Sequence, residues 1–151
     1  MNFAKAKACL VLKESEFDEI FEIFCSDEEF LCHVLISDDC FMLEFFTTLI
    51  GLDRLDILEL DFVEVFSILL QKMGFNEELF ADLLLESESV RALTVLMLLF
   101  KTENISKRFE GYLPDGEFQI WAAGLAALID KRKDHFPFSP NALIRAIQCV
   151  L

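Results

Sequence analysis

The chain has 151 residues, of which 54% are hydrophobic and 17 are phenylalanine. This composition excludes a disordered chain and is sufficient for one sizeable core. The formal net charge is −14, and the acidic excess lies in residues 1–100, whereas residues 101–151 are close to balanced. Nucleic-acid binding requires clustered cations, so we expect no direct binding of nucleic acid by the acidic part.

The cysteines indicate a reduced, intracellular compartment, because their number is odd and no CxxC pair or secretory signal is recognisable. A metal site at Cys25, Cys32 and His33 is one interpretation of their spacing. Cys32 and His33 are adjacent on a predicted helix and so point about 100° apart, which suits a single tetrahedral ion poorly. Buried core thiols are therefore favoured, and no metal or cofactor is predicted.

The first half of the chain reads as helices in series. Residues 3–13 form a short helix whose apolar side lacks a capping partner, so we expect the chain to be the C-terminal part of a longer protein. Residues 14–25 form the next helix, and a capping box at Ser26 and Glu29 begins another that ends at Ile36. A further helix runs to Ile50 and ends at Gly51.

The connector at residues 52–60 carries carboxylates that invite an acid/base or calcium interpretation. It has neither EF-hand spacing nor a glycine at the sharp turn, so a solvated acidic face is favoured.

Residues 61–100 are the most strongly patterned stretch and predict three helices. The first carries an apolar stripe and ends at Gly74, Asn76 caps the second, and Ser87 caps the third. From Leu93 to Phe100 only one residue is polar, which predicts a helix buried on all sides. This apolar run is too short to cross a bilayer, which takes roughly 20 residues, and no membrane partner is predicted.

Residues 14–50 and residues 61–101 share one pattern at a shift of about 49 positions. Apolar positions coincide between the two segments, and so do the acidic positions near the helix caps. Such a period with three helices per unit predicts an all-α, armadillo-like or HEAT-like stack within a single domain spanning 1–151. The alternative is two similar amphipathic segments in an ordinary helical bundle.

The last third of the chain predicts a loop at residues 101–116 and then a C-terminal helical pair, residues 117–151. The first helix of the pair, residues 117–133, ends in basic residues. An extended segment, residues 135–140, follows. Ser139 then caps a final helix whose first residue is Pro140. That helix has an apolar face made by Ala142, Leu143, Ala146, Ile147 and Val150.

A basic and aromatic edge at this turn is the candidate partner-binding site, formed by Lys131, Arg132, Lys133, Phe136 and Phe138. The alternative interpretation is that the cations only offset the partial negative charge at the C-terminus of their own helix. His135 has no serine or cysteine nucleophile in a recognisable context, and no phosphate loop or metal set is present. We therefore predict no enzymatic activity and no small-molecule substrate.

The segment FPFSPNALIRAI resembles the C-terminal signature of the Lines homolog family, in which an FPYNP-type turn leads into a short leucine-rich helix. The block from Phe66 to Phe100, with its Gly74–Phe75–Asn76 turn and its LLLESES junction, resembles the block upstream of that signature. Together these segments cover about a third of the chain. Phe138 stands in place of the usual tyrosine and Ser139 in place of the usual asparagine.

The resemblance implies an armadillo-like, non-catalytic protein that acts in developmental, Wnt-linked transcription and signalling in the nucleus or the cytoplasm. It implies a protein partner of the zinc-finger transcription regulator class. An alternative from another class is a compact regulatory bundle that binds an amphipathic helix of its partner.

Overall fold

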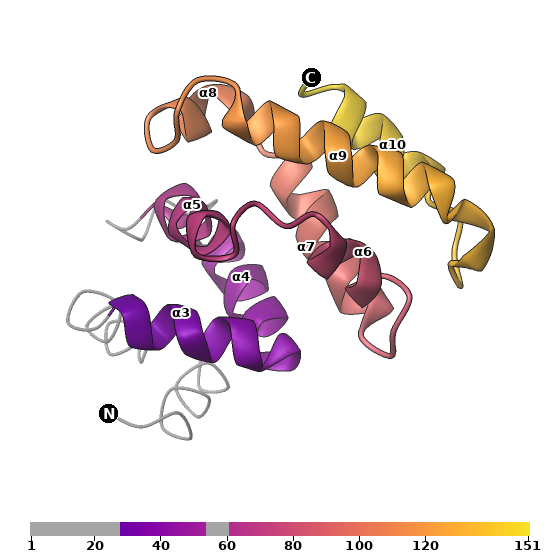
Figure 1. Ribbon diagram of the computed structural model, residues 1–151, viewed down its shortest axis with the longest axis horizontal. Helices are drawn as coiled ribbons and strands as arrows, with labels where there is room; N and C mark the ends of the chain where they lie inside the picture. Colours follow the sequence, from indigo (N-terminus) through magenta and orange to yellow (C-terminus); the bar gives the residue numbers. More distant parts are fainter. Residues whose placement is uncertain (1–27, 54–60) are drawn as a thin grey trace. The chain divides into compact units, whose positions relative to one another are not determined.

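The computed structural model describes residues 28–53 and 61–151 (Figure 1). These residues form eight α-helices and one 3₁₀ helix and contain no strand, so the all-α prediction is confirmed for them. The chain divides into two compact units, Met1–Phe62 and Val63–Leu151, which are described separately. The helices predicted at residues 3–13 and 14–25, and most of the connector at 52–60, lie outside the described residues. No described helix is long and apolar enough to span a membrane.

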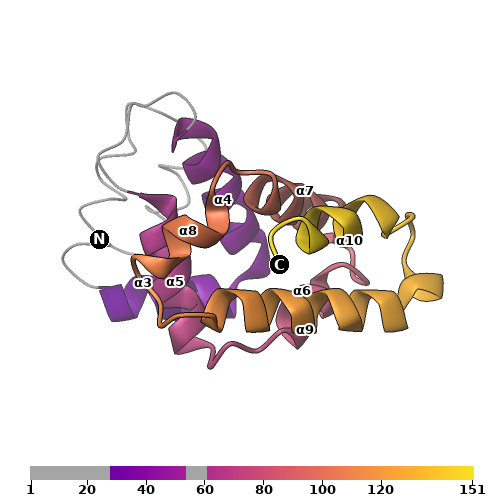
Figure 2. The same cartoon turned by 90° about the horizontal axis from the view of Figure 1, so that it is seen from above.

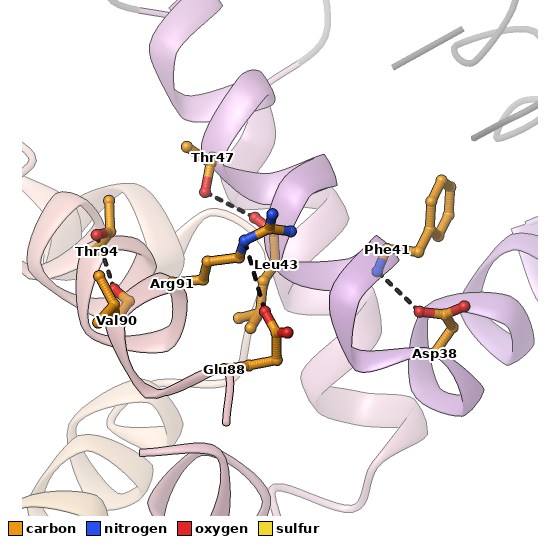
Figure 3. A network of polar contacts seen from close by, with 8 residues as sticks. All are labelled: Asp38, Phe41, Leu43, Thr47, Glu88, Val90, Arg91 and Thr94. Atoms are coloured by element: carbon orange, nitrogen blue, oxygen red, sulfur yellow. Dashed lines mark hydrogen bonds and ion pairs between the residues drawn. The ribbon is translucent and has the colours of Figure 1, made fainter. Parts of the chain in front are cut away.

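In the first unit, helix α3 (Glu28–Ser37) packs on helix α4 (Asp39–Asp53). Oδ1 of Asp38 accepts a hydrogen bond of 2.9 Å from the amide of Phe41, so Asp38 caps α4 (Figure 3). The predicted end at Gly51 is wrong, because α4 continues through this residue to Asp53. A glycine ends a helix where it takes the left-handed conformation, and Gly51 does not take it.

The second unit contains helices α5 to α10. Their bounds are α5 (Phe62–Lys72, which starts at the boundary of the two units), α6 (Glu78–Leu83), α7 (Ser89–Phe100), α8 (Ile105–Glu110), α9 (Glu117–Lys131) and α10 (Asn141–Gln148). Helix α9 packs on α6, α8 and α10, and α7 packs on α6 and α10 (Figures 1 and 2). Helix α9 is thus central to the packing of this unit.

The turn between α5 and α6 follows the sequence prediction. Gly74 has φ +64°, and its amide donates to the carbonyl of Gln71 at 3.1 Å. The amide of Phe75 donates to the carbonyl of Leu70 at 2.8 Å, which completes a Schellman motif. Oδ1 of Asn76 then accepts a bond of 2.9 Å from the first amide of α6. The stop at Gly74 is confirmed. The N-cap of α6 is Glu77, which makes no side-chain capping bond, so the cap position assigned to Asn76 is wrong by one residue although Asn76 does bond the first amide of the helix.

Helix α7 departs from its prediction in two ways. It begins at Ser89 with Glu88 at the N-cap, so the cap assigned to Ser87 is wrong. The Glu88 carboxylate makes no capping bond and lies 3.5 Å from Arg91 instead (Figure 3). The predicted apolar run is also not buried on all sides, since Thr94 is exposed. One face carries the buried residues, and Leu93, Met97 and Leu98 lie partly exposed on its flanks.

Residues 101–116 were predicted to be a loop, because glycine, proline and asparagine are frequent there. The structure has helix α8 within this segment. Ile105, Phe109 and Leu113 recur at a spacing of four and are buried, so they anchor this segment to the core. Asn104 takes the left-handed conformation with φ +57° at the N-cap of α8.

The C-terminal turn also differs from its prediction. Helix α9 ends at Lys131, and residues Lys133–His135 form a 3₁₀ helix, so the extended segment does not begin at His135. Phe136 is extended, as the residue before a proline should be. Helix α10 begins at Asn141 with Pro140 at the N-cap and no side-chain capping bond, so the cap assigned to Ser139 is wrong. Of the predicted apolar face of α10, Leu143, Ala146 and Ile147 are buried, whereas Ala142 is exposed.

An aromatic cluster forms the core of the second unit. Trp121 is 2% exposed and lies within about 6 Å, centroid to centroid, of four phenylalanine rings on α5, α6, α7 and α9. Phe109 of α8 stacks on Phe118 of α9 at 4.1 Å. The six members of the cluster are Phe66, Phe80, Phe100, Phe109, Phe118 and Trp121. Five helices therefore share one packed centre.

Candidate interaction edge

The predicted basic cluster lies at the C-terminal end of α9, where the chain turns towards α10. Lys131 is the last residue of α9 and is exposed. Arg132 follows with non-helical angles, and Lys133 begins the 3₁₀ helix with an exposed side chain. The three cations are therefore not all on the helix, contrary to the predicted range of 117–133.

Arg132 has a structural contact that the sequence analysis did not anticipate. Its Nη1 donates to Oδ1 of Asp82 at 2.8 Å and so joins the end of α9 to α6. The side chains of Arg132 and Asp82 are 28% and 53% exposed, so solvent screens the pair. Arg132 is thus engaged within the unit, whereas Lys131 and Lys133 extend into solvent.

The two phenylalanines of the predicted edge stack on each other. The rings of Phe136 and Phe138 have centroids 5.5 Å apart and planes 23° apart. Phe136 is only 9% exposed, whereas Phe138 is half-buried. Phe136 therefore serves mainly to anchor the turn, and Phe138 presents the accessible part of the aromatic pair.

The part of the predicted site that is accessible to a partner is smaller than the five residues suggest. It consists of two solvent-exposed lysines and the outer side of Phe138. Such a set can contact an acidic or aromatic segment of a partner through charge and stacking. It contains no nucleophile and no acid/base pair.

A shallow hollow of about 440 Å³ lies elsewhere in the second unit, between the end of α7, helix α8 and the tail after α10. Within it, the hydroxyl of Ser106 donates to the carbonyl of Val150 at 2.7 Å. Lys107 is its only charged side chain, and Cys149 lines it with an exposed thiol. Its full lining is Thr102, Asn104, Ile105, Ser106, Lys107, Cys149, Val150 and Leu151. Residues 101–116 were predicted to be a loop, so nothing in the sequence indicated this hollow.

The described residues contain no group of three or more histidine, cysteine, aspartate or glutamate side chains that could hold a metal ion. Cys32 is buried, which confirms its prediction as a core thiol, and His33 is exposed. Cys25 lies outside the described residues.

The outer face of α9 is a surface feature that the sequence analysis did not assign. Ile120, Ala123 and Ala127 are exposed there. A signal was available, because Gln119 is the only polar side chain from Phe118 to Ile129.

Comparison with known proteins identified no relative of this chain. No family model, no curated protein and no solved structure matches it.

Proposed function

We propose that this chain is a non-catalytic protein–protein interaction module built as an armadillo-like stack of three-helix repeats. The observation that carries the proposal is the register of helix packing in the second unit. Helix α8 contacts α5 through Phe109 and Phe66, whose centroids are 6.0 Å apart, while α9 packs on α6 and α10 packs on α7. Each helix of the triplet α8–α10 thus meets its counterpart in the triplet α5–α7. In-register packing of this kind is typical of helical solenoids.

The order of helices in the first unit is consistent with the same repeat. Helices α3 and α6 begin at Glu28 and Glu78, and helices α4 and α7 begin at Asp39 and Ser89, an offset of 50 residues in both cases. Buried positions of α4 recur in α7 at that offset. These pairs are Met42 and Ala92, Phe45 and Val95, Phe46 and Leu96, Leu49 and Leu99, and Ile50 and Phe100.

We further propose that the module belongs to a Lines-type regulator of developmental, Wnt-linked transcription, whose partner is a zinc-finger transcription regulator. The support is the resemblance of the FPFSPNALIRAI segment and of the block from Phe66 to Phe100. The exposed lysines Lys131 and Lys133, beside the partly accessible ring of Phe138, are the contact surface in this proposal. The module acts in the nucleus or the cytoplasm.

The test is affinity capture with the full chain from cell extract, read by mass spectrometry. The variant Lys131→Glu/Lys133→Glu reverses both exposed charges of the edge and leaves the anchored residues Arg132 and Phe136 in place. The matched control is Lys101→Glu/Lys107→Glu, which makes the same charge change at exposed lysines elsewhere in the second unit.

Enrichment of a zinc-finger regulator that the edge variant loses and the control keeps would support the proposal. Equal capture by both variants would remove the edge from the proposal. If wild-type chain enriches no transcription regulator, the Lines-type role fails.

A compact bundle that binds an amphipathic helix of its partner is the second candidate. One observation favours it: α8 has six residues where α5 has eleven, so the two triplets are unequal. Small-angle scattering separates the two, because a continued stack gives an elongated particle and a bundle gives a compact one.

A further inference from the structure

Ser139 is an exposed serine in the turn between α9 and α10. The sequence assigns it the cap of α10, but Pro140 takes the N-cap position and no side chain caps this helix. The Ser139 hydroxyl also forms no hydrogen bond with any other residue that the structure describes. The oxygen is therefore accessible, and no internal contact would be lost if it were modified.

The residue after Ser139 is a proline, and no other serine or threonine of the 151 residues precedes a proline. Proline has no backbone N–H group. Serine/threonine kinases of the proline-directed class accept proline after the phosphorylated residue, because their substrate pocket offers no partner to an N–H group at that position. The Ser139–Pro140 pair is the kind of sequence that this class recognises, and it occurs once in the chain.

Side chains alone hold the segment that carries Ser139. Residues 136–139 make no backbone hydrogen bond with the described part of the chain, and two of the residues from 136 to 140 are prolines. Phe136 is extended, with φ −80° and ψ 146°, which is the backbone form that precedes a proline. Phe136 and Pro140 are buried on either side of the exposed serine. Opening of this segment therefore breaks two buried contacts and no backbone hydrogen bond, so it needs less free energy than global unfolding.

We propose that Ser139 is a phosphorylation site for a proline-directed serine/threonine kinase, which acts when the segment opens far enough to expose Pro140. Oγ of Ser139 attacks the γ-phosphorus of Mg²⁺-bound ATP. The bond from the γ-phosphorus to the bridging oxygen of ADP breaks, ADP leaves, and the hydroxyl proton passes to a carboxylate of the kinase. Ser139 thereby gains a group with a charge of about −1.5 to −2 at pH 7.

The phosphate changes the charge of the candidate interaction edge. Lys131 and Lys133 are the exposed cations of this edge, since Arg132 is paired with Asp82. A phosphoserine in the same turn offsets most of the charge of the two lysines, so an acidic segment of a partner should bind more weakly. This effect rests on the interaction function proposed above, whereas the modification itself does not.

The test treats the full chain with a purified proline-directed kinase of the mitogen-activated class and Mg²⁺-ATP. Mass spectrometry of the intact chain and of its peptides gives the number of phosphates and their positions. The test variant is Ser139→Ala, and the matched control is Ser87→Ala, which removes another exposed serine. A synthetic peptide spanning residues 131–145 is the fully open reference.

We expect one phosphate per chain, on Ser139. Ser139→Ala should abolish the incorporation and Ser87→Ala should leave it unchanged, because only Ser139 precedes a proline. Wild-type chain should react more slowly than the peptide, in proportion to the population of the open segment. Phe136→Ala removes one of the two buried anchors, so it should raise the rate at least about threefold. Circular dichroism shows whether the variants remain folded.

Three results would overturn the inference. A phosphate on the peptide and none on wild-type chain would show that burial of Pro140 closes the segment to the kinase. Phosphate on neither would show that the sequence around Ser139 does not suit this class. Undiminished incorporation in Ser139→Ala would place the phosphate elsewhere.

The effect on the edge has its own measurement. Phosphorylated and unphosphorylated chain are compared in the affinity capture described above, with phosphatase inhibitors in the extract. We expect less of the captured regulator with the phosphorylated chain. Equal capture would remove the effect on the edge and leave the phosphorylation site in place, so the modification and the proposed function can fail separately.

Discussion

Nη1 of Arg132 lies 2.8 Å from Oδ1 of Asp82, and this contact joins two helices whose residues are 50 positions apart in the chain. This ion pair connects the candidate interaction edge to α6. Because both side chains are substantially exposed, solvent screens their attraction.

Arg132→Ala should therefore lower the free energy of unfolding by no more than about 1 kcal/mol. Urea denaturation followed by Trp121 fluorescence measures it. Asp82→Ala should have a similar effect, and the double variant should cost less than the sum of the two, because the second change finds the pair already broken. A fully additive cycle would show that the contact contributes nothing to stability.

Trp121 is the single tryptophan of the chain and is almost fully buried. Among the described residues its Nε1 has no hydrogen-bond partner, and four neighbouring phenylalanine rings surround the indole. Trp121→Ala should destabilise the second unit by about 3–5 kcal/mol, since it leaves a large cavity. Trp121→Phe should cost much less, because it retains most of the ring contacts and removes the unpaired N–H group.

Thermal unfolding by circular dichroism measures both variants, because they lack the fluorescent indole. The emission of wild-type chain should be blue-shifted and should move to the red on unfolding. A loss below about 1 kcal/mol for Trp121→Ala would contradict a packed aromatic centre.

Gly124 lies in the interior of α9, and the Glu77 side chain passes over it. Gly124→Ala gains up to about 1 kcal/mol of helix propensity, but the new Cβ must displace the Glu77 carboxylate. The gain should therefore be small in wild-type chain and larger in a Glu77→Ala background. Chemical denaturation of wild-type chain, the two single variants and the double variant gives the coupling energy between positions 124 and 77. Equal gains in stability in both backgrounds would show that Glu77 does not contact residue 124.

Gly74 has φ +64° at the end of α5, whereas Gly111 at the end of α8 has φ −72°. Gly74→Ala should destabilise the second unit by about 1 kcal/mol, because a side chain at positive φ is strained. Gly111→Ala is the control. Its Cβ would lie 3.4 Å from the Arg108 carbonyl, an ordinary contact, so it should change stability little. A comparable loss in both variants would show that the sign of φ does not determine the effect.

The sequence predicted the helices well where one dominant local signal was present. Gly74 marks a helix end through backbone chemistry that needs no distant partner, and that prediction is confirmed. Asn76 lies within one residue of the helix start, where Glu77 is the N-cap. Gly51 is a glycine like Gly74, but α4 continues through it to Asp53, so a glycine alone does not determine where a helix ends. Helix α8 was missed because its buried residues, Ile105 and Phe109, lie among residues that usually form loops.

The candidate edge could be predicted only as a position in the chain. The stacking of Phe136 and Phe138 and the engagement of Arg132 by Asp82 depend on how α6 and α9 meet, which no local pattern encodes. For the same reason, Ile120 could not be assigned to an exposed or a buried face from a sequence that is apolar on both sides of the helix.

The aromatic cluster has a consequence for folding cooperativity. Rings from α5, α6 and α7 meet rings from α8 and α9 around the same indole. In a simple repeat array the terminal unit can unravel alone, because it contacts only its neighbour through a modest interface. Here α8 and α9 share their core with the preceding three helices. Their slowest amides should therefore exchange with solvent hydrogen at one common rate, set by opening of the whole second unit.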